Sequence, residues 1–109
     1  LLTKDSNIFP SETDRSAQTH ALFYNCDVSD EQAVSACITA VIEKFSGLDA
    51  LINNAAIVSP WIGGKDDPHT PFDALPVSNF RRFIEVNLVG SYICSRYAAP
   101  HLRSTKGCI

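Results

Sequence analysis

Positions 48 to 57 carry the sequence Leu-Asp-Ala-Leu-Ile-Asn-Asn-Ala-Ala-Ile. The apolar run at positions 50 to 52 predicts a short strand that is buried on both faces. Two asparagines and two alanines follow it directly, and a ligand lying across a strand end needs small side chains there. Asparagine amides can also bind free backbone groups of neighbouring strands. Two interpretations stay open at this point: an ordinary turn after a buried strand, or a binding site at the edge of a sheet.

The composition is typical of a globular domain. The chain has 109 residues and a net charge of -3. Because it has no basic run and no stretch near the roughly 20 apolar residues of a membrane helix, we expect neither nucleic acid nor a membrane as partner. The cysteines and histidines lack metal-ligand spacing, so we expect no metal site. Three of the four cysteines lie in predicted elements, which favours buried, reduced thiols in a cytoplasmic protein.

The pattern around the opening stretch predicts a strand at 21–26, a helix at 30–45 and a strand at 49–53. Apolar residues recur in the helix at steps of three and four. Ser29 is expected to cap this helix in a capping box with Gln32, and Gly47 to take the left-handed conformation after it. An order of strand, helix and strand predicts a right-handed crossover in a parallel sheet, and therefore an α/β fold.

A long connection and a long helix complete the pattern. The loop 58–77 contains four prolines, so it is either a functional lid with Trp61, His69 and Phe72 facing a substrate, or a solvent-facing loop. A helix is predicted from Ser78 to about Arg103, with a bend or an end at Pro100. Its predicted inner face comprises Phe80, Phe83, Ile84, Leu88, Tyr92 and Ser95. The amide of Asn87 is predicted to point inward, and the apolar outward face comprises Val89, Ile93 and Tyr97.

Together these stretches resemble the short-chain dehydrogenase/reductase family, in its single-domain branch. The resemblance rests on positions 26–30, 47–56, 80–90, 99–102 and 107–109. It implies a Rossmann-type, doubly wound parallel sheet that binds NAD or NADP, here represented by about strands 2 to 5. No methionine occurs anywhere in the chain, which indicates an internal piece. We therefore expect residues 1–109 to be the central part of one such domain.

The resemblance also implies a set of cofactor-binding residues. Asp27 matches the acid whose carboxylate accepts a hydrogen bond from the adenine amino group, and Val28 the residue whose N–H binds the adenine ring. A helix N-terminal acid is the structural alternative for Asp27. Asn54, Ala55 and Ala56 match the segment under the adenosine ribose. Ala56 stands where the family most often has glycine, and a methyl group is a small intrusion.

One catalytic residue is implied as well. Asn87 matches the asparagine that holds a water in a proton relay toward the active-site lysine, and a purely structural buried amide is the alternative. The family's glycine-rich turn, active-site serine and Tyr-x-x-x-Lys pair do not occur in these residues, since none of Tyr24, Tyr92 and Tyr97 has a lysine four positions on. We therefore expect this piece alone to be inactive.

Two residues near the start of the chain bear on whether the cofactor is NAD or NADP. If the chain opens at the end of a strand, Asp5 is placed to accept a hydrogen bond from the adenosine 2′-hydroxyl, which favours NAD, whereas the neighbouring Lys4 favours NADP. We lean to NAD.

Three functions compete. The leading hypothesis is an oxidoreductase that moves a hydride between nicotinamide and an alcohol or carbonyl substrate. The complete protein would then be a homodimer or homotetramer in contact through the long helix. The alternatives are a non-catalytic nucleotide-binding or scaffold protein with the same sheet, and a sugar-nucleotide epimerase, which the Asn-Asn-Ala-Ala segment disfavours.

Overall fold

Two long helical units form the frame of the structure, a computed structural model that describes residues 21–58 and 71–109. The first unit is α1 (Glu31–Phe45). The second is almost continuous: α2 (Val77–Ile84), a π-helical turn η3 (Glu85–Val89) and α3 (Gly90–Thr105) follow one another, after a short 3-10 turn η2 (Phe72–Ala74). The expectations for Lys4, Asp5 and positions 59–70 of the loop lie outside the described residues.

The helix α1 begins one residue later than predicted. Asp30 is its N-cap, and the Asp30 carboxylate accepts hydrogen bonds from the backbone N–H groups of Gln32 at 2.9 Å and Ala33 at 3.1 Å. The predicted cap at Ser29 is therefore wrong, because the Ser29 hydroxyl binds Asp27 instead. At the other end Ser46, not Gly47, adopts the left-handed conformation, with φ 63°.

The long helix has about the predicted extent, and it does not end at Pro100. The α-helix α3 runs through this proline to Thr105, and the chain leaves it at Lys106, which has φ 60°. The side of the helix at Pro100 is exposed to solvent, where a carbonyl that loses its helical partner can bind water. Of the two outcomes predicted for Pro100, a bend or a helix end, the helix end is therefore wrong.

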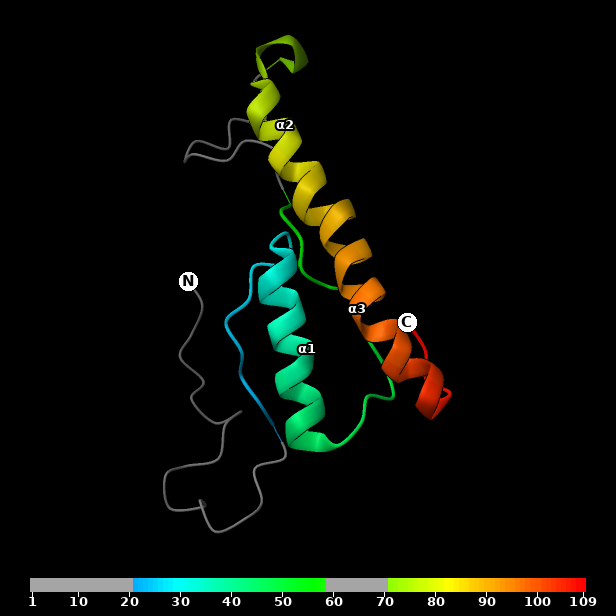
Figure 1. Cartoon of the computed structure of the whole chain (residues 1–109). Coiled ribbons are helices and arrows are strands. Elements are labelled where there is room, and N and C mark those ends of the chain that lie inside the picture. Colours follow the sequence, from blue (N-terminus) through cyan, green and yellow to red (C-terminus); the bar gives the residue numbers. More distant parts are fainter. Residues whose placement is uncertain (1–20, 59–70) are drawn as a thin grey trace, which may run out of the picture.

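The core lies where α1 packs against the second helical unit (Figure 1). The buried apolar side chains are those of Val34 on α1 and of Val86, Ile93, Ala98 and Leu102 on η3 and α3. Two polar contacts add to this packing, because one carboxylate oxygen of Glu31 accepts hydrogen bonds from Arg96 and from the Tyr97 hydroxyl, both at 2.9 Å.

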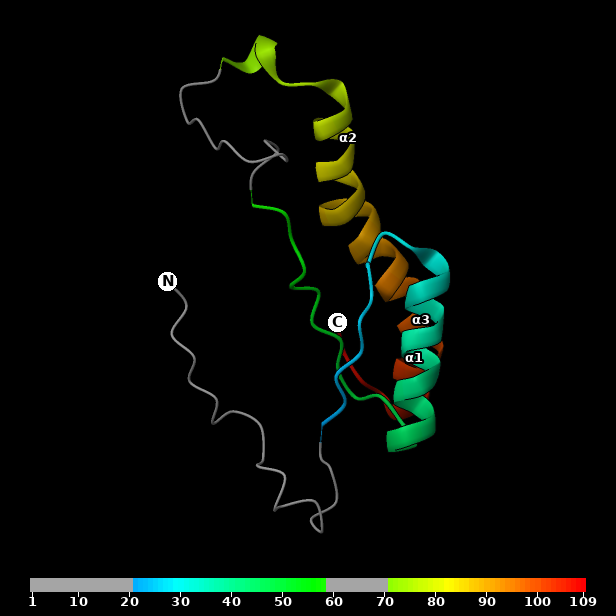
Figure 2. The ribbon, with the colours of Figure 1, turned by 90° about the vertical axis from the view of Figure 1, so that its left-hand side faces the viewer.

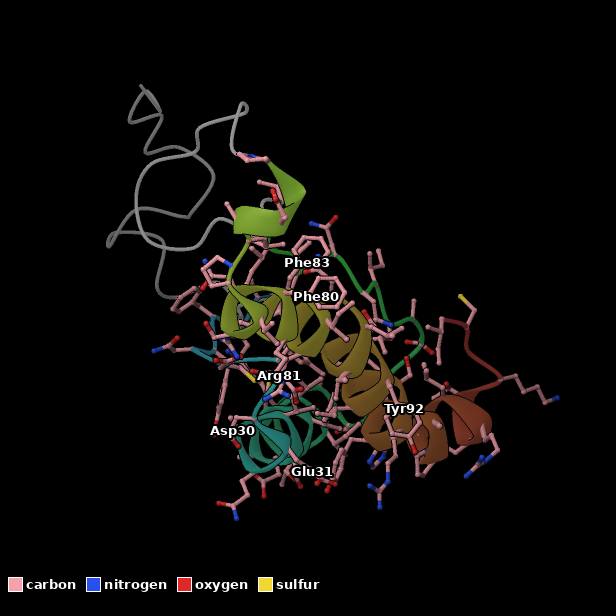
Figure 3. The ribbon with its side chains drawn as sticks, turned by 90° about the horizontal axis from the view of Figure 1, so that it is seen from above. Asp30, Glu31, Phe80, Arg81, Phe83 and Tyr92 are labelled. Atoms are coloured by element: carbon pink, nitrogen blue, oxygen red, sulfur yellow. The ribbon has the colours of Figure 1, made fainter. Side chains whose placement is uncertain are left out.

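The faces of the second helical unit are not those predicted from the sequence. Ile93, expected to face outward, is only 8% exposed, whereas Leu88 and Tyr92, expected to face inward, are 64% and 65% exposed. Phe80 is also exposed, and Figure 3 shows Phe80 and Phe83 projecting from α2 on the side away from α1. The reason is that η3 inserts an extra residue into the helical repeat and that the packed side contains small residues, Gly90 and Ala98, as well as large ones.

The predicted strands are extended segments with little pairing in the described part of the chain. One parallel bridge joins Ala50 to Cys108, with hydrogen bonds from Leu51 N to Cys108 O at 3.0 Å and from Cys108 N to Asp49 O at 3.1 Å. This bridge places the residues that follow α3 beside positions 49–51. Positions 21–26 form no ladder with a described residue, so a strand there is not seen.

The described helices lie on one side of these extended segments (Figure 2). Several apolar side chains of the segments remain exposed, among them Phe23, Ile52 and Ile109. A strand of a doubly wound sheet is covered by helices on both faces, which agrees with the apolar character of these residues.

Candidate functional site

The segment after the parallel bridge is tied to the second helical unit by two asparagines. The Asn87 carboxamide is bonded twice to the backbone of Ile57: its oxygen accepts from Ile57 N, and its Nδ2 donates to Ile57 O, both at 2.8 Å. Asn53 Nδ2 donates to the Ser95 hydroxyl at 3.1 Å. Both ends of the stretch 53–57 are therefore held against the helix, and Asn87 points inward as predicted.

Asn87 owes its position to the π-helical turn η3. The Gly90 N–H donates to the carbonyl of Glu85, five residues earlier, which widens the helix at this point. The Ser91 hydroxyl donates to the backbone oxygen of Asn87 at 3.1 Å, so this oxygen also has a hydrogen-bond partner. π-Helical turns are frequent at functional sites.

The loop residue Val28 approaches the same stretch. A Cβ added to Gly90 would lie 2.7 Å from Val28 Cγ2, so only a glycine on the helix allows this contact. A small cavity of about 70 Å³ forms where the loop, the helix and the stretch meet. Among the residues that line it are Val28, Asn54 and Ala55, three of the six predicted site residues.

This cavity is too small for a dinucleotide, since ligand pockets usually measure several hundred Å³. The adjoining surface is open instead, because Asn54, Ala55, Ala56 and Asp27 are exposed. Small side chains at Ala55 and Ala56 leave room for a group lying flat across the end of the stretch. The other three predicted site residues, Asp27, Ala56 and Asn87, do not line the cavity.

The Asp27 carboxylate is held in one orientation. Its Oδ1 accepts hydrogen bonds from Ser29 N at 3.0 Å and from the Ser29 hydroxyl at 2.6 Å, and its Oδ2 accepts from Arg82 Nη2 at 2.7 Å. These bonds, that of the Ser29 hydroxyl first, lower the pKa of Asp27 from 3.8 to about 2. Asp27 is therefore a fixed anion at neutral pH, and it does not act as the N-terminal cap of α1.

The four cysteine thiols are free. Cys26, Cys37 and Cys94 are half-buried rather than fully buried, and Cys108 is exposed. Burial, and then the neighbouring Cys37 and Cys94, raise the pKa of the Cys26 thiol. In the described part of the chain no cluster of histidine, cysteine and acidic residues is suited to hold a metal ion. No helix among the described residues is long and apolar enough to cross a membrane.

The residue that sequence reasoning missed is Arg82. It is an ordinary polar residue on a helix, and its partner lies far away in the sequence, so no local pattern marks it. Ser95 was expected on the inner face of the helix, but its partner Asn53 was not predicted.

Comparison with known proteins assigns the chain to a family. A sequence model of the short chain dehydrogenases matches residues 5–109, nearly the whole chain. The chain belongs to the short-chain dehydrogenase family. The resemblance seen in the sequence is thereby confirmed.

Individual relatives agree with this assignment. L-fucose dehydrogenase of Oryctolagus cuniculus is 35% identical over 87 residues, which are 80% of this chain and 28% of that protein. Meso-2,3-butanediol dehydrogenase of Serratia marcescens is 36% identical over 91 residues, which are 82% of this chain and 32% of that protein. The chain therefore spans about a third or less of these curated relatives.

Solved structures of the family share the fold. The KRED1-Pglu enzyme gives a TM-score of 0.69 at 25% identity, with 87% of this chain and 36% of that one covered. The structure of ElxO with NADP bound gives a TM-score of 0.60 at 31% identity, with 80% and 32% covered. The predicted α/β class of the Rossmann type is thus supported, although the strand count of the sheet stays a prediction.

Proposed function

We propose that residues 1–109 form the central part of a single NAD(P)-binding Rossmann domain, in a dehydrogenase or reductase that acts on an alcohol or carbonyl substrate. The observation that carries this proposal is the double hydrogen bond of Asn87 to Ile57, which sets Asn54, Ala55 and Ala56 at the rim of the site. Relatives named as dehydrogenases and a neighbour with bound NADP support the reaction class.

The described residues fit an adenosine moiety. Ala55 and Ala56 are small and exposed, and the Asp27 carboxylate is ionised and half-exposed. We assign Asp27 as acceptor for the adenine amino group, Val28 as backbone donor to the adenine ring, and the stretch 54–56 as the surface under the ribose. The nicotinamide of the bound cofactor would supply or accept the hydride.

Asn87 is proposed as the residue that holds a water of the proton relay. A carboxamide has two N–H donors and two acceptor lone pairs, and the bonds to Ile57 use one of each. The remaining donor and acceptor are therefore available to a water. This chain holds no Tyr-x-x-x-Lys pair, so we expect the 109-residue piece to be inactive by itself.

Three further expectations belong to this proposal. The free thiols favour a reducing compartment such as the cytoplasm. NAD remains the favoured cofactor form, on the basis of Asp5. A homodimer or homotetramer remains expected, now through the exposed apolar side of the second helical unit instead of the face that packs on α1.

The test is a steady-state assay of the complete protein, meaning the gene product that contains this chain. Reduced or oxidised NAD and NADP are offered with a panel of alcohols and carbonyls, and binding of each dinucleotide is titrated by fluorescence. We expect binding and turnover, with NAD preferred. Dinucleotide binding without turnover on any substrate would favour the alternative, a nucleotide-binding scaffold.

A further inference from the structure

Arg82 makes a two-pronged contact with the turn that carries Asp27. Its Nη1 donates to the Ser29 hydroxyl at 2.5 Å, and its Nη2 donates to Asp27 Oδ2 at 2.7 Å. Arg82 lies on α2, whereas Asp27 and Ser29 lie on the loop that leads into α1. The guanidinium fork therefore joins two parts of the chain that are far apart in the sequence.

We propose that Arg82 is a positioning residue that sets the Asp27 carboxylate for selection of adenine over other purines. The proposal rests on the nucleotide-binding function proposed above. Arg82 does not touch the base in this scheme, because it acts through Asp27 and through the Ser29 hydroxyl.

The number of acceptor positions supports this role. A carboxylate has about four acceptor positions, two on each oxygen. Ser29 fills both positions on Oδ1, and Arg82 fills one position on Oδ2. When the contacts made by the described residues are counted, one acceptor position on Oδ2 is therefore left. Half of the Asp27 side chain is exposed, so this position is accessible from solvent.

One remaining acceptor on a fixed anion matches one donor of a ligand. The exocyclic amino group of adenine is such a donor, whereas hypoxanthine has a carbonyl oxygen at the same place, which a carboxylate repels. Without Arg82 the carboxylate keeps its bonds to Ser29 on one oxygen only, and the second oxygen is free to bind water. Selection between the two bases should then weaken.

The geometry of the contact requires arginine. A guanidinium presents parallel N–H groups in a planar fork and reaches both partners at once, whereas an ammonium is a single point charge. Arg82→Lys should therefore retain part of the selection of adenine over hypoxanthine, and Arg82→Gln should retain little of it. Arg81 is the matched control, since it is the neighbouring arginine on α2 and forms no ion pair with a described residue.

The experiment compares NAD with nicotinamide hypoxanthine dinucleotide in the complete protein. Dissociation constants of both are measured by titration for the wild type and for Arg82→Gln, Arg82→Lys and Arg81→Gln. A hydrogen bond to a charged group corresponds to roughly a tenfold preference for NAD in the wild type and in Arg81→Gln. We expect about a twofold preference in Arg82→Gln, an intermediate value in Arg82→Lys, and kcat at saturating NAD unchanged within about twofold in the control Arg81→Gln.

One result would overturn the proposal while leaving the proposed function intact. That result is an unchanged preference for NAD in Arg82→Gln, and if the affinity for both dinucleotides falls by the same factor, the contact is merely structural. Absence of binding of either dinucleotide to the wild type would instead overturn the proposed function itself, and this inference with it. Arg82→Lys keeps the charge and serves as the second variant if Arg82→Gln is poorly folded.

Discussion

At the scale of single residues, close approach decides which side chains the site tolerates. Gly90 lies against Val28, and an added Cβ would also lie 3.3 Å from the Val28 backbone oxygen. Gly47 is a matched comparison, because the nearest atom to its added Cβ is Thr105 Cγ2 at 3.7 Å, an ordinary contact. We therefore expect that replacement by alanine changes the stability of the protein differently at the two glycines.

Gly90→Ala should destabilise the complete protein by about 1–3 kcal/mol, since the helix or the loop must move apart to admit the methyl group. Gly47→Ala should change stability by less than about 1 kcal/mol. Urea unfolding followed by circular dichroism measures both. Equal effects of the two substitutions would show that Gly90 and Val28 are not in close contact.

The Asp27 carboxylate gives a prediction for pH dependence. Its pKa is lowered in the folded state, chiefly by the Ser29 hydroxyl, to about 2. Its stabilising contribution is therefore present above the unfolded pKa near 3.8 and is lost as the pH falls toward 2. We expect the wild type to lose stability more steeply between pH 4 and 2 than Asp27→Asn. The difference should be small, because half of the side chain is exposed.

Unfolding free energies across this pH range provide the measurement. Asp49→Asn is the control for removing one carboxylate. The same slope in Asp27→Asn and the wild type would contradict the hydrogen bonds assigned to Asp27.

At the scale of elements, the sequence predicted the helices better than their faces. The steps of three and four residues were enough to place α1, because one apolar stripe packs on one neighbour. The second helical unit contains a π-helical turn and has bulky apolar residues on both its buried and its exposed side. Leu88 and Tyr92, for example, are exposed, so bulky apolar residues alone do not mark the buried side. Asn87 nevertheless points inward, as the helical periodicity predicted, and its amide finds its partners on the backbone of Ile57.

The pairing of the extended segments and the arginine contact could not be predicted in the same way. Pairing of positions 49–51 with Cys108, and of Arg82 with Asp27, joins residues that are distant in the sequence. Local patterns carry no information on such partners. The Asp30 cap was missed by one position because serine and aspartate are both good N-caps and stand side by side here.

Asp30→Ala tests the cap of α1 directly. Loss of the two hydrogen bonds to the backbone should destabilise the protein by about 1 kcal/mol. Gln32→Ala is the control, since Gln32 would matter only in the capping box with Ser29 that the structure does not contain, and we expect a change within about 0.5 kcal/mol. Thermal unfolding of both variants decides between the two caps. A larger effect of Gln32→Ala would support the capping box.

At the scale of the whole molecule, an apolar stripe on the second helical unit remains exposed. It comprises Phe80, Leu88 and Tyr92, and side chains of this size in one row are typical of an interface. A second copy of the protein is the occupant that we expect. A glutamate in this stripe would place a charge in a desolvated contact.

Leu88→Glu and Tyr92→Glu should each shift the complete protein from dimer or tetramer toward monomer. Thr39→Glu, on the exposed side of α1, is the control and should leave the assembly unchanged. Light scattering coupled to size exclusion gives the mass. A wild type that elutes as a monomer, or an oligomer that both variants leave intact, would refute this interface.

The most direct test of nucleotide binding at the stretch 54–56 is a titration of the complete protein with NADH, compared with its Ala55→Leu variant. Ala55 is exposed and small where the adenosine is expected to lie, and a leucine there would occupy that space. We predict saturable binding by the wild type and a loss of affinity of at least about tenfold in the variant, with the fold unchanged by circular dichroism. Equal affinity of both proteins for NADH would contradict a nucleotide site at the end of this stretch.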